Sequence, residues 1–340
     1  MDDRRVLSVY FGGGTPTILD DDSLAYIIDE VSGESGVAEV TLEANPEHVT
    51  HQRALAWKRM GVTRVSLGIQ SFRDDMLRFL GRGHRGAEGI KAVETLAEVG
   101  FDEISVDLIY GGKYDDAADE KYEAAWEADL ALVQRMPISH VSCYELTLEP
   151  HTPLHTMAKT RRVLCAEETL ARMMAMVPQV LGMARYEISN YGREGVVSAH
   201  NVSCWAGLPY LGDGVGAHSL TIHDGEICRR SNTVRVSLYM DVFSSCGRQG
   251  FEPPVEFEEH LSVQMHLAER LICAARTCFE WSPDAIAARL GGDVAPYEKG
   301  ITRAVSLGLL EKNGDICRTT PKGIELNNKL DELLFDGAPM

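Results

Sequence analysis

The chain has 340 residues, 44% hydrophobic and 25% charged, which is enough for one large core with a small appended module. Its formal net charge of −18 disfavours binding to nucleic-acid phosphates but leaves room for a local site for a small anion. It has no apolar run of about 18 residues and no apolar leader at its start, so we expect no membrane span and no signal peptide. We therefore expect a cytoplasmic protein.

Short apolar runs alternate with amphipathic segments in the first part of the chain, which predicts strands separated by single helices. Such strands need crossover connections, so they form a parallel sheet, either open or closed into a barrel. The predicted strands are Val6–Phe11, Glu39–Leu42, Arg64–Gly68, Glu103–Ile109, His140–Leu146 and Arg185–Ile188. The predicted helices are Asp22–Val31, Thr50–Met60 with Thr50 as N-cap, Gly86–Val99, Glu120–Val133 and Glu167–Leu181.

Polar residues recur where each predicted strand ends, and in parallel α/β folds these carboxyl ends carry the chemistry. The first strand ends in three glycines followed by Thr15-Pro16, which allows a ligand to approach the main chain closely. The polar ends together predict one shared ligand-binding rim. The other five ends are Glu43-Ala44-Asn45-Pro46, Gly68-Ile69-Gln70-Ser71, Asp107 to Gly111, Tyr144 to Thr147 and Glu187 to Asn190.

The pattern changes after about residue 195, where a second glycine-rich stretch, Gly212 to Ser219, precedes a helical module. A long helix is expected from Glu259 to Arg276, and Ser282-Pro283 indicates the start of another. A further helix and a hairpin with an Asn313-Gly314 turn complete a winged-helix-like layout. Because the acidic balance argues against a DNA reader, we interpret this module as a packing and lid element.

Eight cysteines are spread along the chain without any Cys-x2-Cys or Cys-x3-Cys-x2-Cys spacing. In a reducing compartment such cysteines are reduced and often buried, so we predict structural roles and no metal site. They are Cys143, Cys165, Cys204, Cys228, Cys246, Cys273, Cys278 and Cys317.

Five segments taken in order make the chain resemble radical S-adenosylmethionine (SAM) proteins. They are Gly12 to Pro16, Glu43 to Pro46, Ser66 to Phe72, Leu80-Gly81-Arg82-x-His84 and Asp107 to Gly111. Within that group the chain is similar to oxygen-independent coproporphyrinogen III oxidases and to HemW heme chaperones. Three further segments favour the HemW side, namely Tyr144 to Leu154, Tyr186 to Tyr191 and His200-Asn201-x-x-Cys204-Trp205. The similarity extends from about Val6 to Leu334.

The resemblance implies an α/β fold, a partial (β/α)6 TIM-like barrel whose first βα unit is missing, followed by the C-terminal helical module. It implies a barrel domain over residues 1–230 and a helical domain over residues 231–340. SAM would lie across the strand ends, its charged groups met by backbone oxygens, carboxylates and a guanidinium. The SAM-binding residues expected from the family are Gly13, Gly14, Thr15, Glu43, Gln70, Arg82, Asp107, Thr147 and His218.

His200 is the candidate axial ligand for heme iron, with a hydrogen-bonded structural histidine as the alternative. His84 is expected to be structural or to orient Arg82. Cys204 stands where the related pattern has tyrosine, which weakens the transfer of a porphyrin contact to this position and leaves ligation of iron by its thiolate as an alternative.

The family's [4Fe–4S] cluster needs three cysteines spaced Cys-x3-Cys-x2-Cys before the glycine-rich strand, and the sequence has none. Three explanations follow. The start codon is misassigned, the chain is a fragment of a longer protein, or the chain is a cluster-free descendant of the family. As written, we expect it to be inactive in SAM cleavage. Two further departures appear. Gly111-Gly112-Lys113, followed by the insert Tyr114–Lys121, stands where relatives have Gly-Leu-Pro, and Gly212-Asp213-Gly214-Val215 replaces a more apolar glycine stretch.

Three functions remain open. The first is a HemW-like heme-binding and heme-delivery protein whose partners are SAM, heme or another porphyrin, and a recipient protein. The second is a radical SAM enzyme of the coproporphyrinogen oxidase type, provided that a cluster segment exists upstream. The third is an inactive paralogue that binds SAM without chemistry.

Overall fold

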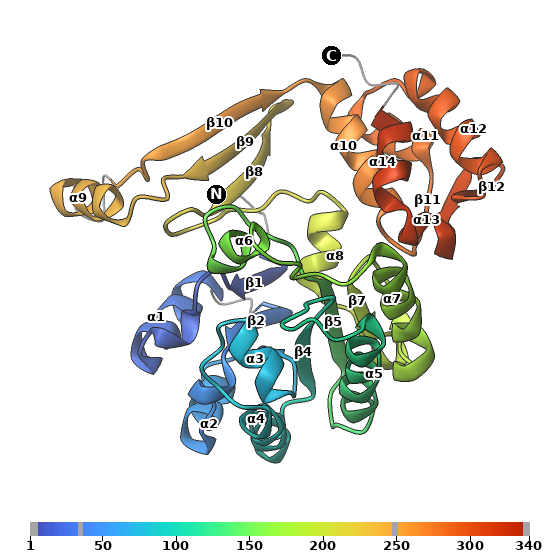
Figure 1. Cartoon of the computed structure of the whole chain (residues 1–340). Coiled ribbons are helices and arrows are strands. Elements are labelled where there is room, and N and C mark those ends of the chain that lie inside the picture. The colour runs from blue at the N-terminus through green and yellow to red at the C-terminus, as the bar shows by residue number, and fades with distance from the viewer. Residues whose placement is uncertain (1–5, 33–36, 247–250, 336–340) are drawn as a thin grey trace. The chain divides into compact units, whose positions relative to one another are not determined.

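A computed structural model describes residues 6–32, 37–246 and 251–335 of the chain, except the side chains of Ser32 and Cys246 (Figure 1). The chain divides into two compact units, Met1–His200 and Asn201–Met340, and each is described by itself. The expected domain boundary after residue 230 stays a prediction. No helix in the described ranges is long and apolar enough to cross a membrane.

The first unit is built on one seven-stranded sheet of order β1-β2-β3-β4-β5-β7-β6. Neighbouring strands from β1 to β5 run parallel, which confirms the βα repeat expected from the sequence. The strands are β1 (Ser8–Phe11), β2 (Glu39–Ala44), β3 (Arg64–Gln70), β4 (Glu103–Tyr110), β5 (His140–Glu145), β6 (Ala184–Arg185) and β7 (Asn190–Gly192).

The helices of this unit lie close to their expected positions. Thr50 caps α2 as predicted, because its side-chain oxygen accepts a hydrogen bond from the Arg53 backbone nitrogen at 3.2 Å. The longer helices are α1 (Asp21–Ser32), α2 (His51–Arg59), α4 (Gly86–Val99), α5 (Asp119–Gln134) and α7 (Glu167–Leu181). Shorter turns are η1 (Pro16–Ile18), η2 (Pro46–His48), α3 (Asp74–Phe79), α6 (Pro153–Ala158) and η3 (Arg193–Gly195).

The sixth predicted strand is wrong in extent and direction. In place of a parallel strand Arg185–Ile188, the short strands β6 and β7 form a hairpin, and β7 runs antiparallel to β5. The buried Glu187 lies in the connection, where its Oε1 accepts a hydrogen bond from the Ser189 backbone nitrogen at 3.2 Å. The predicted sixth polar strand end therefore does not belong to the parallel rim.

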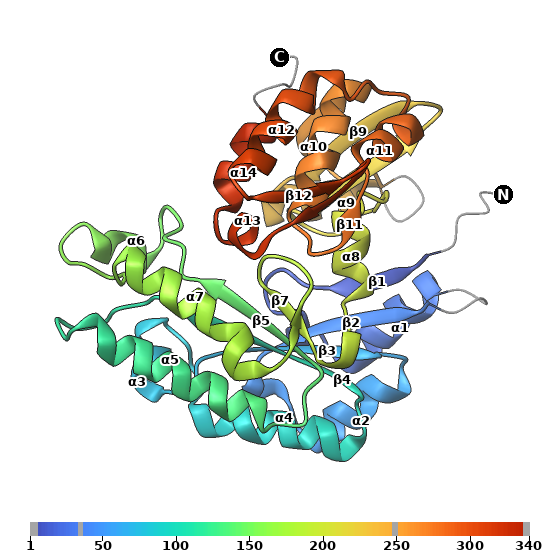
Figure 2. The ribbon, with the colours of Figure 1, turned by 90° about the vertical axis from the view of Figure 1, so that its right-hand side faces the viewer.

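The two faces of this sheet differ in chemistry because side chains alternate along each strand. One face carries a buried apolar layer that includes Val40, Leu42, Val65, Leu67 and Val106. Helices α1, α2, α4, α5 and α7 contribute the rest of this core and cover that face (Figure 2). The residues between those apolar positions are polar and point to the opposite face, which we call the polar face.

The second unit begins with a feature that the sequence analysis did not predict, a three-stranded antiparallel sheet. It consists of β8 (His218–His223), β9 (Glu226–Asn232) and β10 (Val255–Leu261) in the order β10-β9-β8. Asp224-Gly225, both with positive φ, form the turn between β8 and β9, and this Asp-Gly pair was a readable hairpin signal. Leu220, Ile227 and Leu261 form a small core on one side of the sheet.

The long helix expected from Glu259 is wrong at its beginning. Residues Val255–Leu261 form β10, and the helix α10 (Val263–Ala275) starts only after Ser262, whose Oγ accepts a hydrogen bond from the Met265 backbone nitrogen at 3.2 Å. Further helices of this unit are α8 (Ala199–Trp205), which continues from the first unit, and α9 (Val236–Cys246).

The winged-helix-like layout of the C-terminal module is present as expected from the sequence. Ser282 caps α11 (Pro283–Leu290), and the hairpin of β12 (Leu310–Asn313) and β13 (Ile316–Thr319) follows α12 (Glu298–Ser306). The turn residues are Gly314-Asp315, one position later than predicted. Strand β11 (Glu280–Trp281), the turn η5 (Ala295–Tyr297) and helices α13 (Pro321–Glu325) and α14 (Asn327–Phe335) complete the unit.

Candidate functional site

The polar face of the first unit gathers charged residues from neighbouring strands. Strand register places Glu43 of β2 beside Ser66 of β3, and Asp107 of β4 beside Ser142 of β5. Residues in register on parallel strands share a face, so these side chains lie together on the side of the sheet away from the helices. This arrangement is the strongest candidate site in the described part of the first unit.

Glu43 is held at the end of β2 by groups of the glycine-rich strand. The Tyr10 hydroxyl donates to Glu43 Oε1 at 2.5 Å, and the Gly13 backbone nitrogen donates to Oε2 at 3.2 Å. Gly13 has φ 103°, a conformation that only glycine adopts without strain, and a Cβ added at Gly13 or Gly14 would meet no atom within 4 Å. The main chain is therefore open to a ligand beside a fixed carboxylate.

Tyr10 is a residue that the sequence analysis missed. Burial and the neighbouring Glu43 raise the pKa of its hydroxyl, so it remains a hydrogen-bond donor to that carboxylate at neutral pH. The alternation along β1 was the available signal, since Ser8 and Tyr10 alternate with Val9 and Phe11, which pack on the apolar core.

Asp107 occupies the middle of the polar face. Ser66 Oγ donates to its two carboxylate oxygens at 3.2 and 3.3 Å. Burial raises the pKa of Asp107 to about 6; a hydrogen bond from Ser142 opposes the shift, and the nearby charge of Glu43 adds to it. A carboxylate kept here at a cost in solvation is suited to accept hydrogen bonds from a ligand hydroxyl.

Gln70 and Arg82 stand near the carboxyl end of β3. Gln70 is buried and has φ 67°, a left-handed conformation that is unusual for a residue other than glycine. Arg82 follows α3, and its guanidinium has no hydrogen-bond or ion-pair partner among the residues that the structure describes. The buried His84 contacts the Ile69 carbonyl through Nε2 at 3.1 Å and Glu47 through Nδ1 at 3.5 Å, in agreement with a structural role.

The remaining predicted SAM residues lie in less defined surroundings. Thr15 begins η1 without a side-chain capping bond, and the exposed Thr147 follows β5 with its hydroxyl 3.5 Å from the Glu145 carbonyl. His218 opens β8 in the second unit, so its predicted adenine contact stays a prediction. The roles of all nine predicted SAM residues stay predictions as well.

His200 lies against β1, on the same face as Glu43. Its ring stacks on Tyr10 with centroids 4.6 Å apart, and Nδ1 lies 3.1 Å from Ser8 Oγ. Burial lowers the pKa of His200, which favours the neutral imidazole that binds iron. Tyr10 thus contacts both Glu43, which is predicted to bind SAM, and His200, which is predicted to bind heme iron.

Glu39, a second residue that the sequence analysis missed, fixes the start of α8. Its buried carboxylate accepts hydrogen bonds from Ser198 Oγ at 3.1 Å, the Ala199 nitrogen at 2.7 Å and the His200 nitrogen at 3.0 Å. A carboxylate at a helix N-terminus satisfies backbone donors that otherwise have no partner. The position of His200 therefore depends on β2.

Cys204 lies four residues after His200, on the same helix. Burial raises the pKa of its thiol, so the thiolate needed for iron ligation is disfavoured at neutral pH. The structure gives no support to a thiolate ligand at this position.

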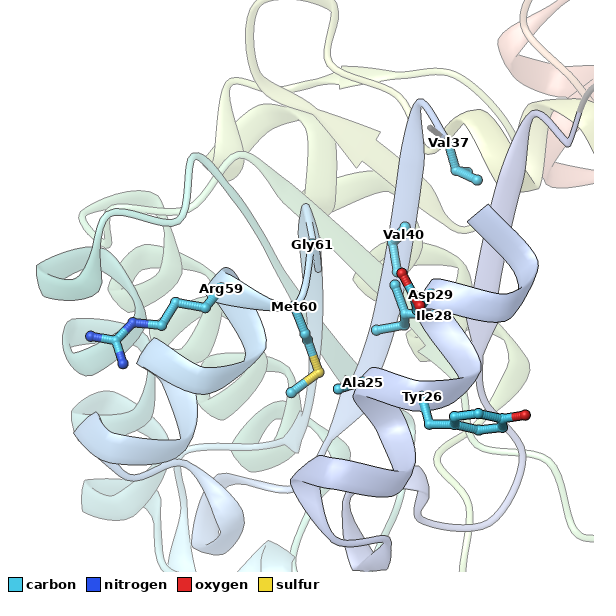
Figure 3. A pocket seen from close by; sticks show the side chains of 9 residues that line it. All are labelled: Ala25, Tyr26, Ile28, Asp29, Val37, Val40, Arg59, Met60 and Gly61. Atoms are coloured by element: carbon cyan, nitrogen blue, oxygen red, sulfur yellow. The ribbon is translucent and has the colours of Figure 1, made fainter. Parts of the chain in front are cut away.

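A hollow of about 640 Å³ lies on the helix-covered side of the sheet (Figure 3). None of its lining residues is a predicted site residue, and the hollow is separated from the polar face by the sheet itself. It is lined by Ala25, Tyr26, Ile28, Asp29, Val37, Val40, Arg59, Met60 and Gly61. We do not assign it to the candidate site.

A [4Fe–4S] cluster does not fit the cysteines of the described ranges. Cys143, Cys165 and Cys317 are buried in cores, and in the described residues no three cysteines bring their sulfur atoms close enough to share a metal. Burial raises the pKa of the Cys143 and Cys165 thiols, which also disfavours the thiolates that a cluster requires.

Three comparisons relate this chain to known proteins. Residues 1–123 match the radical SAM superfamily. Heme chaperone HemW of Haemophilus influenzae is 35% identical over 244 residues, which are 70% of this chain and 61% of that protein. Heme chaperone HemW of Bacillus subtilis is 32% identical over 278 residues, which are 77% of this chain and 69% of that protein.

The structure of the radical SAM enzyme coproporphyrinogen III oxidase (HemN) from Escherichia coli superimposes with a TM-score of 0.77 at 19% identity. The superposition covers 97% of this chain and 78% of that one, and at such identity it shows the fold alone. A zebrafish relative, radical S-adenosyl methionine domain-containing protein 1, is matched over 56% of its length. The chain thus spans little more than half of some curated relatives.

Proposed function

Since this chain belongs to the HemW family of radical SAM proteins, we propose that it binds SAM on the polar face of its first unit and holds heme through His200. The observation that carries the proposal is the position of Tyr10, which contacts Glu43 on one side and His200 on the other. Two ligands bound at these points would be neighbours. Delivery of the heme to a recipient protein is the corresponding activity, by analogy with relatives named heme chaperones.

For SAM, the supporting features are complementary charges around an open main chain. Glu43 and the glycine backbone would receive the ammonium group, and the guanidinium of Arg82, which pairs with no described residue, would receive the carboxylate. Asp107 would accept a hydrogen bond from a ribose hydroxyl, and Gln70 can both donate and accept. Each role follows from the chemistry of the side chain and from its place on or beside the polar face.

For heme, the supporting features are those that hold an imidazole in one orientation. Ser8 fixes the Nδ1 side of His200, and the Tyr10 ring packs on its face. Nε2 is the nitrogen that we propose as the iron ligand, in the neutral form that burial favours.

The proposal concerns binding, for which this chain supplies the residues. Reductive cleavage of SAM would require a [4Fe–4S] cluster, and the 340 residues contain no Cys-x3-Cys-x2-Cys. The cluster, when bound in a radical SAM protein, supplies the electron. The residues of this chain would orient SAM and exclude water around it.

Titration of the purified full chain with ferric heme tests the proposal. We expect a shifted Soret band that saturates at one heme per chain, and His200→Ala should abolish the shift. His51→Ala, an exposed histidine at the start of α2, is the matched control and should leave the titration unchanged. No Soret shift, or a shift that survives His200→Ala, would contradict heme ligation by His200.

A further inference from the structure

The small sheet of the second unit carries sulfur, nitrogen and oxygen donors close together on its polar side. Cys228 Sγ, one carboxylate oxygen of Glu258 and one ring nitrogen of His260 all lie within 4.8 Å of one another. In the described residues, this is the one group of three or more such side chains with ligand atoms that close. We propose that these three residues bind a thiophilic divalent cation of the Zn²⁺ class.

The backbone ladder places the three donors on one face. Cys228 of β9 pairs directly with His260 of β10, and Glu258 precedes His260 by two residues, so both β10 side chains point the same way. The opposite face of this sheet carries Ile227 and Leu261 in the small apolar core. The burial of that core anchors the strands and so fixes the Cα positions of the three ligands.

The separation of Glu258 from His260 suits a four-coordinate metal, and Cys228 Sγ lies within 4.8 Å of both ligand atoms. Bonds of about 2.0–2.3 Å with tetrahedral angles place ligand atoms roughly 3.3–3.8 Å apart. His260 Nε2 already lies 3.6 Å from Glu258 Oε1, and both side chains are exposed enough to adjust. A thiolate, an imidazole and a carboxylate form a mixed donor set that Zn²⁺ accepts and that hard cations such as Mg²⁺ do not prefer.

The positively charged Arg230 lies beside the site but forms its hydrogen bond with a backbone carbonyl. Arg230 pairs with Glu258 in the ladder and shares its face, yet Arg230 Nη2 donates to the Pro253 carbonyl at 2.7 Å. The carboxylate of Glu258 remains next to the imidazole. With three protein ligands, the fourth position of the metal is left for water or for a ligand from solution.

Metal titration of the full chain, freed of metal by a chelator, tests this proposal. Calorimetry with Zn²⁺ should show one site per chain, and Co²⁺ should give the tetrahedral visible spectrum with a thiolate charge-transfer band. Binding needs the thiolate, so it should release a proton. Cys228→Ser should remove the charge-transfer band and weaken Zn²⁺ binding by more than about 100-fold, because outer-shell substitutions alone cost about 10–100-fold.

Two further ligand variants and two control variants complete the test. His260→Gln and Glu258→Gln, both at exposed positions, should weaken Zn²⁺ binding without changing the thermal unfolding of the metal-free chain. His223→Gln and Cys278→Ser are the controls, since His223 is an exposed histidine of β8 and Cys278 lies outside this sheet. Binding that the three ligand variants leave unchanged, or that the controls reduce equally, would overturn the proposal.

Discussion

Asp107 illustrates how a residue suited to bind a ligand reduces the stability of the protein that carries it. Burial raises its pKa to about 6, whereas an aspartate in an unfolded chain titrates near 3.8. Between these two pH values the folded chain binds more protons than the unfolded chain. The contribution of Asp107 to the free energy of unfolding therefore increases as the pH falls from 7 to 4. It decreases again as the pH rises through 6.

Asp107→Asn should remove the loss of stability that comes from burying a charged carboxylate at neutral pH. At pH 7.5 we expect the free energy of unfolding to rise by about 2–3 kcal/mol, since two pKa units correspond to about 2.7 kcal/mol. The difference should shrink toward zero near pH 4. Urea unfolding at several pH values measures this, and calorimetry with SAM should show weaker binding by the same variant.

The exposed Asp102, which directly precedes the strand β4 that carries Asp107, provides the control. Asp102→Asn should change neither the pH profile nor SAM binding. A stabilisation by Asp107→Asn that is equal at pH 4 and pH 7.5 would contradict the burial argument.

Helices α2 and α8 begin with different caps. Thr50 caps α2 through one hydroxyl at the protein surface, whereas the buried Glu39 carboxylate receives three hydrogen bonds around the start of α8. The first cap follows from local sequence. The second joins segments about 160 residues apart and appears only when β2 and α8 come together.

Glu39→Gln should destabilise the protein by about 1–3 kcal/mol, because an amide oxygen cannot replace both carboxylate oxygens and leaves buried donors without partners. Thr50→Ala should cost about 1 kcal/mol, the usual effect of losing a hydroxyl cap. Thermal and urea unfolding give both values. Heme affinity should fall in Glu39→Gln and stay constant in Thr50→Ala, because only the first cap positions His200. Equal heme affinity in both variants would show that the Glu39 contact has a purely structural role.

Two segments show why a sequence pattern can predict the wrong element. The run Arg185–Ile188 has the composition of a strand, but the next residues pair antiparallel with β5, and no local pattern encodes that direction. Residues Glu259–Leu261 fit a helical period as well as a strand. They became part of β10 because they pair with Ile227, Cys228 and Arg229.

On the scale of the whole molecule, the two units have separate cores. The larger apolar cluster extends from Leu24 to Tyr191, and the cluster of the C-terminal module extends from Leu267 to Leu334. Since each of these two clusters consists of residues of one unit, we expect calorimetry to resolve an unfolding transition for each core.

Leu271→Ala tests that expectation, because Leu271 is fully buried in the second of these clusters. The substitution should cost about 2–5 kcal/mol and lower the transition of that cluster by several degrees. The transition of the first unit should not move, and heme binding measured below both transitions should persist. A single transition that shifts as a whole would contradict separate unfolding.

The alternation of strands and helices, the caps at Thr50 and Ser282, and the polar ends of the parallel strands could be predicted from the sequence, because these features depend on neighbours a few residues apart. The sequence also carried the family resemblance, which rests on ordered motifs. Three other features could not be predicted and are seen only in the folded chain: Tyr10 contacts both Glu43 and His200, β7 reverses direction, and Cys228 lies opposite His260. Those contacts join segments far apart in the chain, and they are fixed by strand pairing and core packing rather than by local conformational preference.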